Sequence, residues 1–312
     1  MNNTLVTLFG GGGFVGRYVA QALLAAGARI RVAGRNPRSA YYLKPLGGLG
    51  QTQFIAADIT RRDSVERAVD GADAVVNLVG TFGPQFHAVH VAGAGHVAEA
   101  AKAAGAGALV HLSAIGADPD SASAYGRSKG LGEQAVRAGF PAATILRPSV
   151  IFGREDQFTN RFARMIETLP VVPVLRAQAK FQPVYVADVA DAVVAALTNP
   201  GTHGGRTYAL GGPDVMTMGE IQRFLAQETG REKSFIELPD AAGALIARLG
   251  FLPGAPITQD QWQMLQHDNV VGTGEDGLAA LGIAPTPMGS VAPDWLVVYR
   301  KGGRFGARPE PA

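Results

Sequence analysis

A glycine-rich turn, FGGGGFVGR, occupies residues 9–17, between an apolar run and a helical pattern. Its glycines Gly10, Gly13 and Gly16 recur at every third position. Such a turn uses glycine to bend tightly, to bring the backbone close to a pyrophosphate and to pack the helix against the strand. The free N–H groups at the start of the helix then face the phosphates. We therefore expect a dinucleotide-binding loop with further contacts from Phe14 and Val15; a turn that binds nothing is the alternative.

Short apolar runs alternate with helical stretches over the first two thirds of the chain. The predicted strands are residues 5–9, 29–33, 52–57, 74–80, 108–113 and 143–147, and the predicted helices between them are 14–26, 64–69, 85–104 and 124–138. Continuous apolar runs suit strands that are buried on both faces, and crossover helices between them make the sheet parallel. The sequence therefore predicts an α/β fold with a doubly wound parallel sheet of the Rossmann type.

The second predicted strand ends in RVAGRNPRS, at residues 31–39. An NAD enzyme of this fold carries Asp or Glu there to hold the ribose hydroxyls, whereas this chain has Gly34 and Arg35, with Arg38 close by. Arginine at this position favours a 2′-phosphate, and hence NADPH or NADP over NAD. Arg17 is a second candidate partner of that phosphate. The alternative is that these arginines are ordinary surface charges.

The helical and strand patterns loosen after about residue 150. We expect a helix near 157–169, a proline-rich link at 170–175, strands at 183–187 and 206–210, and helices at 188–197 and 217–229. We therefore predict two domains. Residues 1–153 form an NADP-binding Rossmann domain, and residues 154–312 form a smaller C-terminal α+β lobe, some of whose elements return to the main sheet. A basic tail starts near residue 300.

Composition excludes several classes of protein. The chain has no cysteine, so thiolate metal sites and thiol nucleophiles are excluded. Lys and Arg number 28 against 26 Asp and Glu, too balanced for a binder of nucleic acid driven by charge. The longest stretch without these four residue types, 74–98, holds Asn77, Pro84 and three histidines and is not expected to span a bilayer.

The first residues run straight into a predicted strand, so we expect no signal or transit peptide. The expected location is cytoplasmic, with a peripheral place on the cytoplasmic face of the inner membrane as an extension. Arg300, Lys301, Arg304 and Arg308 make the tail basic. This tail is either a solvated terminus or a contact with an anionic membrane or a partner.

Tyr125 and Lys129 form a Y-x-x-x-K pattern, which places them on one face of a helix. A lysine ammonium in that place lowers the pKa of the phenol, so that the tyrosine can exchange a proton with a carbonyl or an alcohol during hydride transfer. Ser113 ends the fifth predicted strand and could bind the same substrate oxygen. These three are the candidate catalytic residues, and Val79 and Gly80, after the fourth strand, are candidate cofactor contacts.

The glycine turn, the Asp58-Ile59 pair, HLSAIG, YGRSK and PVYVADVA together resemble an atypical, extended short-chain dehydrogenase/reductase. RPSVIFGREDQFTNRFA (147–163), KFQPVYVADVADAV (180–193) and GLAALGIAPTPM (277–288) narrow the resemblance. They are similar to the NAD(P)-binding, epimerase-like accessory subunit of respiratory complex I, the so-called thirty-nine-kilodalton subunit, and to its bacterial relatives. The resemblance covers about residues 4–290.

This resemblance implies that NADPH is bound tightly and for structural reasons, close to the place where quinone enters complex I. Carried over by position, the residues lining the cofactor are Gly10, Gly13, Gly16, Arg17, Arg35, Asp58, Ile59, Ser113, Tyr125, Lys129 and Pro148. Some relatives are linked instead to coenzyme Q biosynthesis, so the implied partners are complex I or quinone-biosynthesis proteins. Because the Ser-Tyr-Lys set is complete, an active NADP-dependent reductase or epimerase and a sensor of the dinucleotide are alternatives.

Other polar and aromatic residues carry weaker expectations. His87, His90 and His96 are expected to be helix residues near the cofactor cleft and not metal ligands. Asp188 is expected to cap the helix that follows PVYVA. Trp262 and Trp295 are expected in the core. The apolar segment 239–254 is either a core helix or an amphipathic helix that meets a membrane or a partner.

Overall fold

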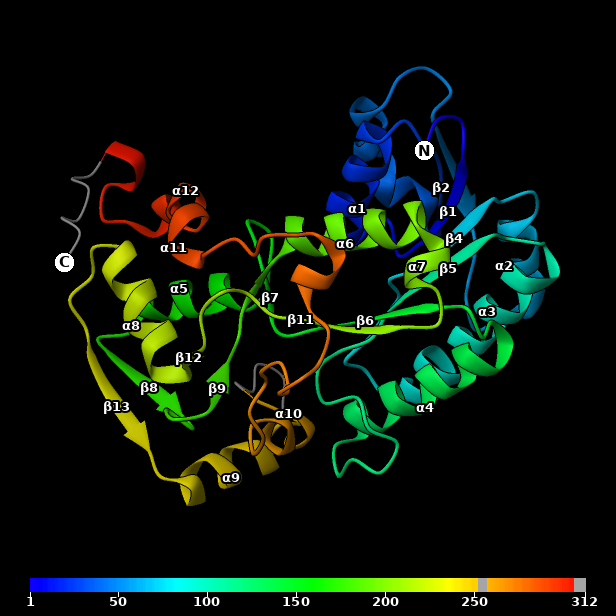
Figure 1. The fold of residues 1–312 in the computed structure, drawn as a ribbon. Coiled ribbons are helices and arrows are strands. Elements are labelled where there is room, and N and C mark those ends of the chain that lie inside the picture. Colours follow the sequence, from blue (N-terminus) through cyan, green and yellow to red (C-terminus); the bar gives the residue numbers. More distant parts are fainter. Residues whose placement is uncertain (252–256, 306–312) are drawn as a thin grey trace. The chain divides into compact units, whose positions relative to one another are not determined.

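The computed structural model describes residues 1–251 and 257–305 of the chain (Figure 1). The protein is made of two compact units. Unit 1 combines Met1–Pro148, Val186–Leu210 and Gly272–Ala284, and unit 2 combines Ser149–Tyr185, Gly211–Val271 and Pro285–Ala312. Each unit is built from three separate stretches of chain.

Unit 1 is built on a seven-stranded sheet in the order β11-β6-β5-β4-β1-β2-β3, with every neighbouring pair parallel. The strands are β1 (Leu5–Phe9), β2 (Arg29–Gly34), β3 (Thr52–Ala56), β4 (Ala74–Asn77), β5 (Ala108–Leu112), β6 (Thr144–Pro148) and β11 (Thr207–Leu210). β1, β4 and β5 are buried along their whole length, as expected for strands covered by helices on both faces. The predicted doubly wound parallel sheet is confirmed.

Helices cover both faces of this sheet, as Figure 1 shows. One face carries α2 (Arg62–Val69), the π-helical turn η2 (His87–Gly93), α3 (Ala94–Ala103) and α4 (Ala124–Gly139). Apolar side chains of α2, α3 and α4 join those of β1, β4, β5 and β6 in a single core. The other face carries α1 (Phe14–Ala25), which packs along α6 (Val186–Thr198). A long 3₁₀ segment, η1 (Pro37–Leu46), joins β2 to β3, and α7 (Pro200–His203) and η3 (Leu278–Leu281) complete the unit.

The last stretch of unit 1, Gly272–Ala284, is hydrogen-bonded to the edge strand β11. The N–H of Ala209 donates to the carbonyl of Asp276 at 2.8 Å, and Arg206 pairs with the carboxylate of Asp276 at 2.5 Å. Return of elements from the C-terminal half is thus visible in α6, α7, β11 and η3. The first stretch of unit 1 ends at Pro148, before residue 153, because β7 (Ile151–Phe152) pairs with β10 (Val184–Tyr185) inside unit 2.

Unit 2 has its own core, in which Phe152, Phe181, Ile221 and Trp295 are buried. Its helices are α5 (Thr159–Thr168), α8 (Met218–Glu228), α9 (Asp240–Arg248), α10 (Gln259–Met264), α11 (Met288–Val291) and α12 (Pro293–Leu296), and its 3₁₀ turns are η4 (Val297–Tyr299) and η5 (Gly303–Phe305). Three two-stranded sheets complete it: β7 with β10, β9 (Lys180–Phe181) with β12 (Met216–Thr217), and β8 (Val171–Leu175) with β13 (Ser234–Leu238). Trp262 and Trp295 are both buried, as expected.

Two local predictions in this region are wrong. The segment 170–175 is not a link, because its β-branched residues pair in parallel with β13 as strand β8. The helix that follows PVYVA begins at Val186, so Asp188 lies in its first turn and does not cap it. For the segment 239–254, α9 buries Gly243 and Ala247 and exposes Leu245, while residues 252–254 lie outside the described chain.

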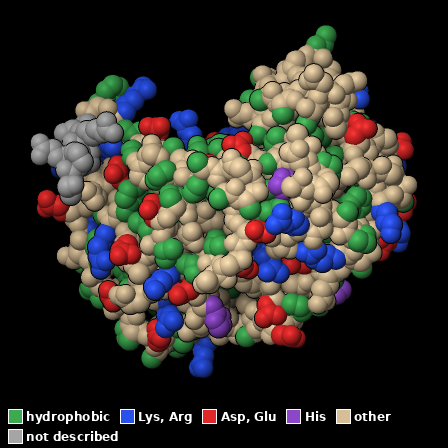
Figure 2. Space-filling view, in the orientation of Figure 1, with side chains coloured by type: hydrophobic (Ala, Val, Ile, Leu, Met, Phe, Trp, Pro, Cys, Tyr) green, Lys and Arg blue, Asp and Glu red, His purple; other side chains and the backbone are tan. Residues whose placement is uncertain are grey.

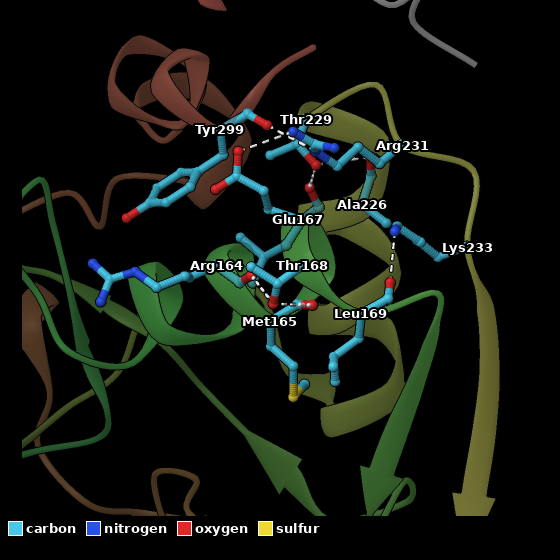
Figure 3. A network of polar contacts seen from close by, with 11 residues as sticks. Arg164, Met165, Glu167, Thr168, Leu169, Ala226, Thr229, Arg231, Lys233 and Tyr299 are labelled. Atoms are coloured by element: carbon cyan, nitrogen blue, oxygen red, sulfur yellow. Dashed lines mark hydrogen bonds and ion pairs between the residues drawn. The ribbon is translucent and has the colours of Figure 1, made fainter. Parts of the chain in front are cut away.

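The start of the basic tail is held by unit 2. Arg231 pairs with Glu167 of α5 at 3.1 Å and donates to the carbonyl of Tyr299 at 2.8 Å (Figure 3). Arg300 donates to the carbonyl of Glu228, at the end of α8, at 2.9 Å. The chain is therefore anchored through residue 300, whereas Lys301 and Arg304 are exposed and Arg308 lies outside the described residues.

None of the helices in the described part of the chain is both long and apolar enough to cross a membrane.

Candidate functional site

The glycine turn joins β1 to α1 with two glycines whose replacement would strain the turn. Gly10 has φ +79°, a left-handed conformation that residues with a Cβ adopt at a cost. A Cβ on Gly16 would lie 2.3 Å from the carbonyl oxygen of Gly10, so only glycine lets the first turn of α1 pack on the loop. Gly13 is the extended residue that precedes α1. The loop therefore presents the helix N-terminus in the geometry that binds phosphate.

A cavity of about 380 Å³ opens at the carboxyl ends of β1, β2 and β4. In a parallel sheet this is where ligands bind, at the point where strand order reverses on either side of β1. The predicted cofactor contacts that line it are Gly10, Gly13, Arg35, Asp58, Ile59, Val79 and Gly80. The predicted contacts absent from its lining are Phe14, Val15, Gly16, Arg17, Ser113, Tyr125, Lys129 and Pro148.

Several lining residues were not predicted from the sequence. Asn36, Pro37 and Ser39 follow β2, Thr60 follows the Asp58-Ile59 pair, and Thr81, Gln85 and Val89 follow β4. For Asn36, Thr60 and Thr81, a place within a few residues of the end of a strand at the cavity is the signal that could have found them.

Charge at the β2 side of the cavity is mixed. Arg35 is exposed at the end of β2 and lines the cavity, whereas Arg38 does not line it. Burial pushes the pKa of Asp58 upward, but hydrogen bonds from Thr60 and the charges of Arg35 and Arg61 outweigh it, so this pKa lies below its usual value. Arg17 stacks on the ring of Tyr42 at 4.5 Å from the ring centre. Of the three candidate arginines, Arg35 is the one that lines the cavity.

Tyr125, Lys129 and Glu133 lie four residues apart along α4, which Ser123 caps by accepting a hydrogen bond from Gly126 N. The Nζ of Lys129 donates to the carbonyl of Leu112, at the end of β5, at 2.9 Å. Burial lowers the pKa of Lys129 to about 8, although the charge of Glu133 opposes this. A Cβ on Gly80 would lie 3.9 Å from this Nζ, so the ammonium group lies beside the end of the cavity.

The hydroxyl of Ser113 donates to the carboxylate of Glu133, a buried residue that the sequence analysis did not single out. Arg147 holds the same carboxylate with two hydrogen bonds, of 2.9 Å from Nε and 2.7 Å from an Nη. Bidentate, charge-assisted hydrogen bonds of this kind are stronger than hydrogen bonds between neutral groups. Glu133 was detectable, because it continues the four-residue spacing of Tyr125 and Lys129. Ser113 therefore has its proton directed into the protein and not towards the cavity.

Aromatic residues surround Tyr125. The ring of Phe82 stacks on it at 4.6 Å and 13°, and Phe86 and His90 meet it edge-on. His90 Nε2 accepts a hydrogen bond from the N–H of Thr81 at 2.9 Å, so its Nδ1 donates to Ser128 Oγ at 2.8 Å. Burial, helped by the charge of Lys129, lowers the pKa of His90 to about 4, in agreement with this neutral form. His90 thus fixes the loop between the cavity and Tyr125.

His96 and Pro148 make hydrogen-bond contacts within unit 1. His96 Nδ1 lies 2.9 Å from the carbonyl of Ile59, and the carbonyl of Pro148 accepts from Ile115 N at 2.9 Å. His87 starts η2. Over the described residues, no group of three His, Cys, Asp or Glu side chains could hold a metal ion.

The residues present fit a bound dinucleotide. Gly10, Gly12 and Gly13 line the cavity directly before the start of α1, and a helix start is where phosphates are favoured. Gly80 and the Lys129 ammonium mark the opposite end of the lining, beyond Val79. Fold and site together define a Rossmann-type dinucleotide-binding protein.

Comparisons with known proteins agree. The model of the NAD dependent epimerase/dehydratase family matches residues 6–211. The mouse (Mus musculus) protein NADH dehydrogenase (ubiquinone) 1 alpha subcomplex subunit 9, mitochondrial, is 35% identical over 297 residues, which are 92% of this chain and 78% of the relative. The chain belongs to the NAD dependent epimerase/dehydratase family, and within it to the family of this respiratory subunit. The predicted resemblance is confirmed.

Two further proteins are similar. The ceramide reductase of Caulobacter vibrioides is 32% identical over 267 residues, 81% of this chain and 80% of that protein. The NADPH complex of the quinone oxidoreductase QOR2 from Escherichia coli has the same fold, with a TM-score of 0.76 and 20% identity over 93% of this chain and 99% of that one.

Proposed function

We propose that the chain is an NADP(H)-binding accessory subunit of the complex I type, which keeps its nucleotide as a fixed part of its structure. The family membership supports NAD(P) binding and a respiratory complex as the partner. Arg35 on the cavity wall, where NAD enzymes carry an acid, supports NADP(H) over NAD. The proposed location is the cytoplasmic side of a membrane, beside the complex and its quinone.

The observation that carries the structural role of the nucleotide is the Ser113–Glu133 contact. A serine that orients a carbonyl substrate must donate its proton to the substrate oxygen. Here that proton goes to Glu133, and Arg147 holds the carboxylate in place from the other side. Freeing Ser113 would leave a buried carboxylate with a lost hydrogen bond, which is costly. This arrangement supports tight binding without turnover.

Fractionation of the native protein from gently solubilised membranes tests this proposal. The chain should co-migrate at high mass with NADH:quinone reductase activity and retain NADPH in amounts equal to its own. Migration as a small free species would overturn the complex I role and turn the search to quinone-biosynthesis proteins as partners.

An active NADP-dependent reductase is the second candidate. The position of Lys129, whose Nζ lies 6.0 Å from the centre of the Tyr125 ring, favours it, as does the similarity to a ceramide reductase. Replacing Tyr125 by Phe separates the two functions. A subunit that only holds the nucleotide keeps its NADPH and its place in the complex, whereas an enzyme loses about 10²–10⁴-fold in turnover. Glu133→Gln is the matched variant for the Ser113 contact, because the amide oxygen of Gln can still accept the hydrogen bond from Ser113.

A further inference from the structure

The segment between β2 and β3 exposes large apolar side chains within a few residues of one another. Exposed fractions are 43% for Tyr41, 39% for Tyr42, 40% for Leu46 and 107% for Leu49. Leu49 stands between Gly48 and Gly50, past the end of η1. Figure 1 shows this blue segment projecting beyond the edge of the sheet, and Figure 2 shows hydrophobic atoms at its tip. We call Arg38, Tyr41, Tyr42, Lys44, Leu46 and Leu49 the η1 surface.

The charge around these side chains has one sign. Residues 1–57 contain six Lys and Arg and no Asp or Glu; the first acid of the chain is Asp58. Because the whole chain has a net charge of +2, residues 58–312 carry −4. The basic region is thus confined to the β1–β3 half of the sheet and the helix and turn that it carries.

One cation of the η1 surface, Lys44, lies against an aromatic ring. The ammonium of Lys44 is 4.0 Å from the centre of the Tyr41 ring, which packs edge-on against Phe54 of the edge strand β3 at 5.1 Å. Arg38 is exposed on η1 itself. The hydroxyl of Tyr42 donates to the carbonyl of Gly12 at 3.1 Å, which fixes the inner side of the segment to the glycine loop. The surface is therefore supported from below and open to solvent.

From this combination we propose that the η1 surface docks the protein on an anionic phospholipid membrane. Leucines insert among the acyl chains, tyrosines lie at the interface, and Lys and Arg meet the headgroups. An anionic membrane surface would repel carboxylates, and the first 57 residues contain none. A protein partner would need a pocket to receive Leu49, which is 107% exposed between two glycines. A lipid surface needs no such complement.

Flotation of the NADPH-loaded full-length protein with phosphatidylcholine vesicles, with and without phosphatidylglycerol, tests this. We expect binding only to the vesicles with phosphatidylglycerol, and weaker binding as salt is raised. The double variant Leu46→Ser/Leu49→Ser should lose roughly tenfold or more in affinity, from the lost burial of two apolar side chains. Arg38→Glu/Lys44→Glu should lose about as much or more, since each cation near the surface contributes about fivefold.

Matched variants exist elsewhere on the chain. Leu245→Ser/Leu249→Ser removes two leucines of α9 that are 61% and 48% exposed, and Lys301→Glu/Arg304→Glu reverses two exposed charges after η4. Both should bind vesicles like the original chain. Binding that is lost in these variants and kept in the η1 variants overturns the proposal in favour of α9 or the tail.

Failure of the original chain to bind any vesicle also overturns the proposal and leaves an acidic protein as the occupant of the surface. None of the substituted side chains lines the nucleotide cavity, so NADPH content should stay constant in all variants and serves as the folding control. Docking on lipid and assembly with a respiratory complex are separate contacts. The vesicle experiment can therefore fail while the fractionation experiment succeeds, and the reverse.

Discussion

We expect single side chains to set the nucleotide preference of the cavity and the pH dependence of the protein's stability. Arg35 gives the β2 wall of the cavity a positive charge, and Lys129 brings a buried ammonium to its other end. Both depend on contacts that one substitution can remove.

Arg35→Asp should reverse the nucleotide preference. Loss of a charge-assisted contact with the 2′-phosphate, together with repulsion by the new carboxylate, should weaken NADPH binding by roughly 10–100-fold or more and leave NADH binding unchanged or better. Titration of the stripped protein with both nucleotides by calorimetry measures this. Arg38→Asp, outside the cavity lining, is the control. An unchanged preference in Arg35→Asp would mean that Arg35 does not contact the phosphate.

Lys129 should make stability depend on pH in the alkaline range. Its pKa falls from 10.5 to about 8 on folding, so between these values the unfolded chain binds more protons than the folded one. The contribution of Lys129 to the free energy of unfolding therefore rises with pH across this window, by about 3 kcal/mol in total. The difference between the original chain and Lys129→Met, from urea unfolding without nucleotide, should show this rise. A flat difference would contradict it.

The way in which secondary-structure elements pack positions the residues of the site. The turn between β1 and α1 works because two glycines let a strand and a helix approach each other more closely than a Cβ allows. Likewise α4 presents Tyr125, Lys129 and Glu133 on one face because its residues repeat every 3.6 positions.

Gly16→Ala should lower the free energy of unfolding of unit 1 by roughly 1–3 kcal/mol or more, because its Cβ would lie 2.3 Å from the carbonyl oxygen of Gly10. Nucleotide binding should weaken with it, since the loop must shift. Gly201→Ala, whose Cβ would meet nothing within 4 Å, is the matched variant and should unfold like the original. Thermal unfolding and NADPH titration give both results. Equal behaviour of the two variants would refute the close-approach argument.

The sequence predicted those parts of the fold and the site that depend on local pattern. Apolar runs located the seven strands of the main sheet, and the glycine spacing together with Arg35 pointed to the cavity. Contacts between distant segments were not predictable in this way. β8 and β13 are short strands far apart in the chain, and the former contains Pro173, which weakens the strand pattern. The four-residue spacing along α4 could have marked Glu133, but its partners Ser113 and Arg147 come from distant segments, and only the folded sheet brings them against it.

The whole molecule is made of two compact units in one chain. The nucleotide cavity belongs to unit 1, whereas both tryptophans, Trp262 and Trp295, belong to unit 2. A ligand that binds only the folded form stabilises the part that holds it. Tryptophan fluorescence therefore reports on unit 2, whereas circular dichroism reports on both units.

NADPH at about 100 times its Kd should add about 2.7 kcal/mol to the stability of unit 1. We expect the urea midpoint followed by far-ultraviolet circular dichroism, which senses both units, to rise more than the midpoint followed by tryptophan fluorescence. The same titration with the Arg35→Asp variant should show little change in either. Equal shifts in both signals would show that the two units unfold as one.

The interleaving of the two units has a consequence for synthesis on the ribosome. Strand β6 ends at Pro148, but its neighbour β11 ends only at Leu210. At about 5–20 residues per second, the outer edge of β6 waits roughly 3 to 12 seconds for a partner. During that interval the nascent chain offers an open row of backbone hydrogen-bonding groups, the kind of edge that pairs with other chains. The cell must protect this emerging edge, so the yield of folded protein should depend on chaperones that act during translation and on the pace of translation between residues 148 and 210.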